Sequence, residues 1–352
     1  MKHPACHFSV LTLSRGKTAG AVARAAYIGR CRLHDERIGK TFSYDHLGGL
    51  LAESTVNWVT GSDRLWNEVE AAETRKNSRV AREIRVALPA ELPLDEMRRV
   101  VHGFSCNLKD RYGVAAQYAI HAPKFHDADD GKQVERKYRE GILNLDEYLH
   151  IMSDPMRTNL NFHAHILVST RKKDEVHGGF GAKVRCLDNI KSGPEEIQTM
   201  RAEWETRTNA ALHRIRSEAR IDLRSYKEMV NTGDAPDGLV PQKHLGPKVS
   251  NAKNAGLVED EKTVHPMQTT HENAEGLPVI EAVVGARAKA KDHNDETWAS
   301  WLILRDLERQ KARLEETQRI ATEREAVRKT EAAKEKEKIL MARRDQDALH
   351  AA

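Results

Sequence analysis

Cysteine is scarce in this chain, and long apolar runs are absent. The four cysteines among the 352 residues are scattered and form no C-x-x-C pair: Cys6, Cys31, Cys106 and Cys186. This spacing excludes a zinc ribbon and a disulfide framework. The sequence also shows no apolar N-terminal segment typical of signal peptides and no stretch long enough to cross a membrane. We therefore expect a cytoplasmic protein without membrane insertion.

Charge of one sign is not in large excess either. The 57 basic and 53 acidic residues leave a net charge of only +4, so the average says little about partners. The local distribution says more, because basic residues crowd the segments 75–85 and 171–185, beside the strands that carry candidate site residues. This pattern favours an anionic ligand, and nucleic acid first of all.

The chain divides into three zones. Residues 1–226 have the mixed composition of a globular domain, and residues 227–296 form a polar linker that we expect to be partly disordered. Residues 297–352 form a charged helical tail, and glycine and proline are already missing from residue 286 onward. The apolar positions of the tail do not sustain a heptad, which favours a solvated helix over a coiled coil.

The first zone interleaves strand-like and helix-like segments. Apolar and β-branched runs predict strands at 7–13, 82–88, 115–121 and 163–169. Helical periodicity predicts helices at 17–28, 63–79 and 94–108, and another after Pro194. Four or five strands among helices predict an α+β fold.

Three histidines are candidate metal ligands. His163 and His165 begin a strand-like run and, being two residues apart, share one of its faces. His121 ends an earlier strand-like run. Three imidazoles from two strands would leave coordination positions open, as a catalytic divalent metal requires. The alternative is a pair of surface histidines on an edge strand. His126 and His150 lie in an insertion expected to be an exposed excursion, and we interpret them as non-ligands.

Tyr27 is a candidate nucleophile within a helix-like segment. A phenol attacks phosphorus only with the help of a base or a nearby cation. The alternative is an amphipathic tyrosine half-buried on a helix. From the residues alone, Tyr44, Tyr112 and Tyr118 have an equal claim.

Glu83 is a candidate partner of the histidines. It lies on the polar side of its predicted strand, opposite Ile84 and Val86. There it could orient a ligand imidazole or take a proton from the nucleophile. The alternative is a cross-strand ion pair.

Taken together, these segments resemble the MobA/MobL relaxases, the DNA-nicking transesterases of mobilisable plasmids, in the group called MOBQ. The matching blocks run in order from residue 7 to residue 244. They include Ser14-Arg15-Gly16, Ala25-Ala26-Tyr27, Asp63-Arg64-Leu65-Trp66-Asn67, Arg82-Glu83-Ile84, Ala119-Ile120-His121-Ala122-Pro123, Asn161-Phe162-His163-Ala164-His165, Gly179-Phe180-Gly181, Arg220-Ile221-Asp222 and Pro241-Gln242-Lys243-His244. The resemblance covers about two thirds of the chain and stops before the tail.

The resemblance implies a fold and a set of roles. The fold would be a central antiparallel sheet flanked by helices, the palm-like arrangement shared with rolling-circle initiators. Tyr27 would be the nucleophile, His121, His163 and His165 the ligands of a divalent Mg²⁺ or Mn²⁺ ion, and Glu83 would lie beside them. The DNA would be a single-stranded or melted origin of transfer, with relaxosome accessory proteins as further partners.

The chain departs from the family pattern in three places. Phe162 replaces the proline that usually precedes the first histidine of the pair, the gap from His121 to His163 is long, and Leu223 stands where the family often has another histidine. Two other functions stay open at this stage. One is a rolling-circle replication initiator that uses the same chemistry, and the other is a non-catalytic origin-binding accessory protein.

Overall fold

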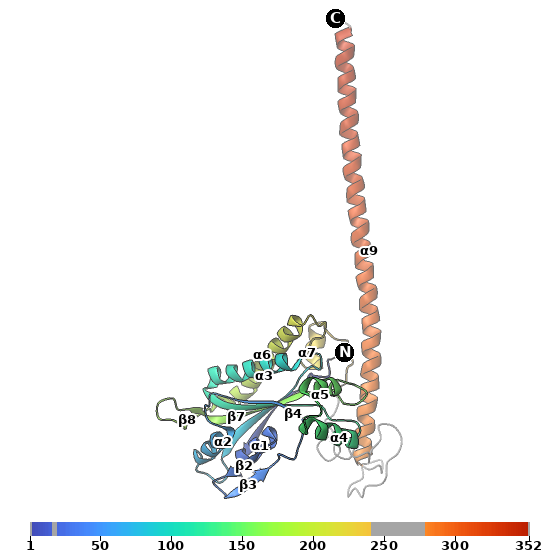
Figure 1. The fold of residues 1–352 in the computed structure, drawn as a ribbon. Coiled ribbons are helices and arrows are strands. Elements are labelled where there is room, and N and C mark those ends of the chain that lie inside the picture. The colour runs from blue at the N-terminus through green and yellow to red at the C-terminus, as the bar shows by residue number, and fades with distance from the viewer. Residues whose placement is uncertain (1, 16–19, 241–278, 351–352) are drawn as a thin grey trace. The chain divides into compact units, whose positions relative to one another are not determined.

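The computed structural model describes residues 2–15, 20–240 and 279–350 (Figure 1). They belong to two compact units, residues 2–223 and the residues from 224 onward. The first unit is close to the domain expected over residues 1–226. The part of the expected linker at residues 241–278 lies outside the described residues.

The first unit is built on one antiparallel sheet of six strands. These are β1 (Phe8–Ser14), β4 (Leu50–Val56), β5 (Arg79–Ala87), β6 (Val114–His121), β7 (His163–Lys173) and β8 (Phe180–Lys183). Their order is β1-β5-β7-β6-β4, with β8 paired to the end of β7. The α+β fold with a central antiparallel sheet is thus confirmed. Sequence periodicity missed β4, an edge strand with polar residues at its centre, and the separate hairpin of β2 (Arg32–Asp35) and β3 (Lys40–Ser43).

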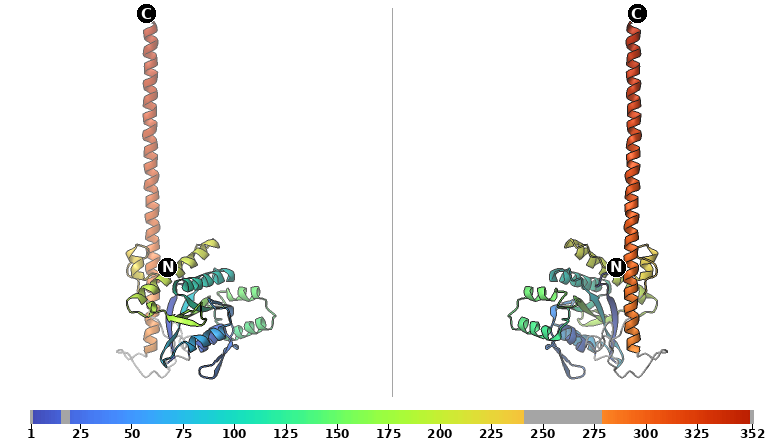
Figure 2. Two further views of the ribbon diagram at one scale, coloured as in Figure 1. Left: turned by 90° about the vertical axis from the view of Figure 1, so that its left-hand side faces the viewer. Right: turned by 90° about the vertical axis from the view of Figure 1, so that its right-hand side faces the viewer.

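Helices cover both faces of this sheet. Those of the first unit are α1 (Ala21–Gly29), α2 (Ser62–Ala71), α3 (Leu94–Tyr112), α4 (Ala128–Arg139), α5 (Leu145–Met152) and α6 (Ser192–Arg214), with a 3₁₀ turn at Cys186–Asp188. Figure 1 and Figure 2 show α1 and α2 on one face and α3 and α6 on the other. Because both faces are covered, β6 is buried at all eight of its positions.

Two hydrophobic cores follow from this layering. In the larger core, Phe104 of α3 and Trp204 of α6 meet edge to face at 5.4 Å and pack with Ile166 of β7. In the smaller core, Trp66 of α2 and the alanines of α1 pack on Leu167 of β7. A fully buried side chain of this size contributes roughly 1.5–3 kcal/mol to stability. Side chains alternate along β7, so the smaller core marks the face on which His163 and His165 also lie.

All four predicted helices differ at an end: α1 is described from Ala21, and α3 runs on to Tyr112. The helix expected over 63–79 ends at Ala71, because no apolar stripe continues past Ala72, and β5 starts at Arg79. The helix expected after Pro194 starts earlier, at Ser192. Proline is tolerated there, since the first-turn amide it lacks has no intrahelical acceptor in any case.

The insertion between His121 and His163 is not the exposed excursion that its charge suggested. It forms α4 and α5, and it buries Tyr148 and Met152 in the larger core. Asn144 starts α5 with a capping box, in which its side chain and that of Glu147 each bond the other's backbone amide. Two helices therefore close over one end of the sheet instead of leaving a solvated loop.

The second unit contains α7 (Tyr226–Asn231) and the long helix α9 (Val279–His350). The boundary expected at residue 296 falls inside α9. A glycine within a helix costs only about 1 kcal/mol, so Gly285 does not end the helix. Trp298 is buried against Met229 and Ala235. Beyond this contact, residues 302–336 of α9 are exposed. No helix in the described ranges is long and apolar enough to cross a membrane.

A chain ending at Gly285 should keep the thermal unfolding midpoint of the full chain to within a few degrees. Both cores of the first unit are built from residues up to Leu223, so the truncation removes nothing from them. Amides of α7 should exchange faster, because Trp298 is lost, and hydrogen exchange with mass spectrometry reads this directly. A midpoint lower by ten degrees would show that α9 stabilises the sheet domain.

Candidate metal centre

The pairing of β6 with β7 brings the three histidines together. His121 lies directly opposite His163 in the antiparallel register, and His165 lies opposite Ala119. The three ring centroids are 4.9–5.3 Å apart. One ring nitrogen from each lies within 4.8 Å of the others. Among the described residues this is the one such group of histidine, cysteine or carboxylate side chains, and His126 and His150 are outside it.

In each imidazole, one ring nitrogen makes a hydrogen bond to a protein oxygen. His121 Nε2 lies 2.7 Å from the carbonyl oxygen of Ile28, and His163 Nδ1 lies 2.9 Å from that of Asn161. His165 Nδ1 lies 2.6 Å from a carboxylate oxygen of Glu83. An oxygen of this kind only accepts, so each of these nitrogens carries the proton. The lone pairs then lie on Nε2 of His163 and His165 and on Nδ1 of His121, which Arg30 Nη2 approaches at 3.4 Å.

Burial keeps the three imidazoles neutral. It lowers the pKa of His121 to about 3 and that of His163 to about 4. Burial also lowers the pKa of His165, although the hydrogen bond to Glu83 works in the opposite direction. Neutral imidazole is the form that binds a metal. Three nitrogen donors with oriented rings fit a divalent transition metal, whereas Mg²⁺ prefers oxygen ligands.

Glu83 is almost fully buried and has cationic neighbours on two sides. Arg24 Nη2 approaches its two carboxylate oxygens at 2.6 and 2.5 Å, and Arg85 Nε lies 3.5 Å away. Burial raises the pKa of Glu83, but the hydrogen bond from His165 and the charge of Arg24 more than offset this, and the pKa lies below its ordinary value. Glu83 therefore makes the orienting hydrogen bond to an imidazole, and its ion pairs with arginine run to α1 and along its own strand, not to a neighbouring strand.

Tyr27 lies beside the histidines on α1. Four of the nine residues of α1 are alanines, which lets the helix approach the sheet closely. The Tyr27 ring is 6.4 Å from that of His165 and 5.4 Å from that of Tyr44, edge to face in both cases. The guanidinium groups of Arg24 and Arg30 lie 5.0 and 4.6 Å from its centre. The half-buried Tyr27 ring is thus in contact with two cations, one from within α1 and one from the residue that follows it.

Arg24 and Arg30 were not among the predicted site residues. Both are three residues from Tyr27, the spacing that puts residues on one face of a helix, and this was the available signal. Arg30 takes a left-handed conformation after α1, with φ of 50°. Its guanidinium donates to the Tyr27 carbonyl at 3.0 Å and lies 3.4 Å from His121 Nδ1. Arg30 thus contacts both the tyrosine and the histidine group.

The three other candidate nucleophiles, Tyr44, Tyr112 and Tyr118, lie in different surroundings. Tyr112 donates to Glu196, and Tyr118 lies on the other face of β6, in the larger core beside His102. Tyr44 alone of the three touches Tyr27. The two basic segments, 75–85 and 171–185, differ in position within themselves. Arg85 lies close to Glu83, whereas Arg75, Arg79, Arg171, Lys183 and Arg185 gather around one cavity.

The chain is similar to known mobilisation proteins. The model of the MobA/MobL family matches residues 19–255. Mobilization protein MobL of Acidithiobacillus ferridurans is 33% identical over 251 residues, covering 68% of this chain and 61% of the relative. A probable mobilization protein MobA of Bifidobacterium longum (strain NCC 2705) is 28% identical over 298 residues, covering 72% of this chain and 45% of the relative. The chain thus spans about half to three fifths of these relatives.

Among solved structures, the likenesses are weaker. One, described as the molecular basis of vancomycin resistance transfer in Staphylococcus aureus, gives a TM-score of 0.46 at 22% identity over 62% of this chain and 98% of that one. Another, the conjugative relaxase TrwC in complex with oriT DNA in a metal-bound structure, gives 0.35 at 10% identity over 80% of this chain and 98% of that one. At these scores neither structure assigns a role to any residue of this chain.

Acid should destabilise the metal-free protein through the buried histidines. His121 and His163 have pKa values of about 3 and about 4 when folded but about 6.5 when unfolded. Between these values the unfolded chain binds protons that the folded chain does not, so stability falls as the pH falls. Thermal unfolding in EDTA should therefore shift to lower temperature from about pH 7 to pH 4.5. A His121→Asn/His163→Asn variant should show a shallower shift, and an equally steep one would contradict the assignment.

Glu83→Gln should weaken Mn²⁺ binding about 10- to 100-fold, because the amide holds the His165 ring less strongly. His163→Ala and His165→Ala should each weaken it further, as each removes a donor. Calorimetric titration with MnCl₂ measures all three. The matched control is Glu53→Gln on β4, whose carboxylate accepts from Gln117 and not from a histidine. Unchanged Mn²⁺ affinity in both histidine variants would rule out the site.

Proposed function

We propose, from the premise that this chain belongs to the MobA/MobL family, that it is a relaxase. In this proposal it nicks one strand at a plasmid origin of transfer, for conjugative mobilisation, acting on single-stranded or melted DNA together with accessory proteins of the relaxosome. The observation that carries the proposal is the position of Tyr27, between two guanidinium groups and beside the three histidines.

The reaction is a transesterification. The phenolic oxygen of Tyr27 attacks the scissile phosphorus, and the bond from phosphorus to the 3′ oxygen breaks. The phenol loses its proton and the departing 3′ oxygen gains one. The products are a 5′-phosphotyrosine and a free 3′-hydroxyl. Because one phosphate ester replaces another, little free energy is lost and the strand can be rejoined by the reverse reaction.

Arg24 and Arg30 supply the positive charge that such a nucleophile needs. An unperturbed tyrosine has a pKa of about 10, so at neutral pH its phenolate must be stabilised as it forms. Two guanidinium groups about 5 Å from the ring favour that charge. They also favour the extra negative charge on the phosphate during attack.

The histidines and Glu83 complete the site. A divalent metal held by His121, His163 and His165 would polarise the scissile phosphate and offset its charge. Glu83 orients His165 and fixes which nitrogen of that ring is free. Both of its oxygens already accept hydrogen bonds, and its pKa is lowered, which makes it a poor proton acceptor. We therefore assign it as a positioning residue and not as the base that deprotonates Tyr27.

A rolling-circle replication initiator would use the same residues in the same way. The mobilization proteins among the relatives favour transfer over replication for this chain. A plasmid that carries the protein and its origin separates the two roles, because a relaxase supports mobilisation into recipient cells and an initiator supports plasmid copying.

Tyr27→Phe should abolish cleavage and leave single-stranded DNA binding within a few-fold, because only the attacking oxygen is lost. Purified protein is incubated with supercoiled origin plasmid and Mn²⁺, treated with SDS and protease, and assayed for covalently nicked DNA. Tyr44→Phe is the matched control, since Tyr44 contacts Tyr27 edge to face, and it should retain the adduct. An adduct that persists in Tyr27→Phe, or that mass spectrometry maps to Tyr44, would refute the assignment.

A further inference from the structure

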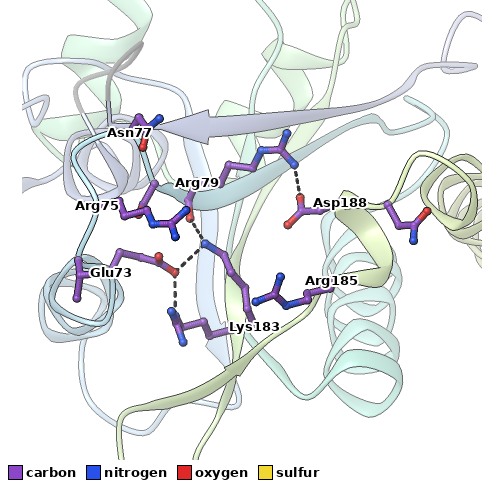
Figure 3. A pocket seen from close by; sticks show the side chains of 11 residues that line it. Glu73, Arg75, Asn77, Arg79, Lys183, Arg185 and Asp188 are labelled. Atoms are coloured by element: carbon purple, nitrogen blue, oxygen red, sulfur yellow. Dashed lines mark hydrogen bonds and ion pairs between the residues drawn. The ribbon is translucent and has the colours of Figure 1, made fainter.

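A basic cavity lies on the same sheet, away from the histidines. It has a volume of about 760 Å³. It is formed by the turn between α2 and β5, by the ends of β7 and β8 and by the turn around Asp188 (Figure 3). Arg171 of β7 lines it, on the strand that begins with His163. His165 and Arg171 are six residues apart, and at about 3.3 Å per residue the cavity is roughly 20 Å from the metal centre.

Positive charge dominates the lining of the cavity. Five cations face two carboxylates: Arg75, Arg79, Arg171, Lys183 and Arg185 against Glu73 and Asp188. Each carboxylate is already shared between two cations. Glu73 pairs with Arg171 at 2.8 Å and with Lys183 at 3.0 Å. Asp188 pairs with Arg79 at 2.6 Å and with the buried Arg82 at 2.5 Å.

Two arginines of the cavity have no acidic side chain as a partner. The side chains of Arg75 and Arg185 have no hydrogen-bond or ion-pair partner within the part of the chain that the structure describes, and both residues are exposed. Figure 3 shows them on opposite sides of the cavity, with their guanidinium groups directed toward the space between them.

The other cations are fixed by the protein itself. Arg171 also donates to the carbonyl of Gly181 at 2.9 Å, and Lys183 to that of Arg79 at 3.2 Å. Arg15 donates to the carbonyls of Glu73 and Arg75 at 2.8 and 3.3 Å, which holds the turn. The cavity is therefore a preorganised cationic frame with two free guanidinium groups, an arrangement that suits the oxygens of a phosphate.

We propose that this cavity is a second phosphate-binding site, which holds the DNA backbone at a distance from the point of cleavage. The assignment of DNA as the ligand of this cavity rests on the proposed function. At 3.4 Å per nucleotide along a duplex strand, roughly 20 Å spans about six nucleotides, so the site would hold duplex DNA beside the melted segment that carries the scissile phosphate. The site contributes to affinity for long DNA and has no part in the chemistry at Tyr27.

The test uses the full chain carrying Arg75→Ala and Arg185→Ala together. Its affinity for a 40-base-pair duplex of arbitrary sequence is measured by fluorescence anisotropy over a salt series. Phosphate contacts are independent of sequence, so affinity should fall on the order of ten-fold and the salt slope should decrease by about 1 to 2. The matched control is Arg99→Ala with Lys109→Ala, two exposed cations on α3. It removes the same charge and should leave the affinity within about two-fold.

A second arm separates this site from the nicking site. Cleavage of an origin oligonucleotide that extends only three nucleotides to each side of the nick should be unchanged in the Arg75→Ala/Arg185→Ala variant. Duplex affinity equal to that of the control variant, or equal loss of short-oligonucleotide cleavage, would overturn the proposal. If no chain forms an adduct but duplex binding still depends on the arginine pair, the proposed function fails and the phosphate site stands.

A third arm distinguishes DNA from a small phosphate. Calorimetry with inorganic phosphate and with a nucleoside triphosphate should show no saturation in the low millimolar range. Submillimolar binding of either ligand, lost in the double variant while duplex affinity is kept, would assign the cavity to a small ligand and refute the DNA assignment.

Discussion

The register between β6 and β7 is the constraint on which the site depends. Antiparallel pairing puts His121 opposite His163 and leaves His165 one pleat further along the same face. A slip of one residue would turn every side chain of one strand to the other face and would separate His121 from the pair. The register is held because both faces are buried. Ile120 and Ile166 belong to the larger core, and Ala119 and Leu167 to the smaller one. The hydrophobic cores thus specify where the polar groups meet.

Glu83 connects this strand pair to the helix that carries Tyr27. It reaches His165 across the sheet and Arg24 on α1. A buried ion pair of this kind adds little net stability, because the desolvation of both charges offsets their attraction. Its value lies in geometry, since one carboxylate fixes a ring of the metal centre and a cation beside the tyrosine. The alanines of α1 have a complementary role, because larger residues would hold the helix further from the sheet.

Much of this arrangement could be predicted from the sequence, and the reasons are local. The central strands are apolar runs, and H-x-H within a strand puts both imidazoles on one face whatever the fold. The Ala25-Ala26-Tyr27 block pointed to the tyrosine through a resemblance and not through chemistry. Arg24 and Arg30 were missed because many surface arginines share their spacing. The insertion was misjudged because α4 and α5 bury only a few large side chains among many charged ones.

The basic segments show why neighbourhood in sequence is not neighbourhood in the fold. Arg171 follows His165 closely along the chain, yet a strand is extended, and six residues move it roughly 20 Å away. That distance decides what a charge can do. At 0.1 M salt the screening length is about 10 Å, so exposed cations around the cavity would contribute little to the negative charge that forms at Tyr27 in the proposed reaction. Arg24 and Arg30, about 5 Å from its ring and partly shielded from solvent, lie within that range. In the proposed function, separate sets of cations would therefore have separate tasks, one for the charge at the tyrosine and one for a polyanion further away.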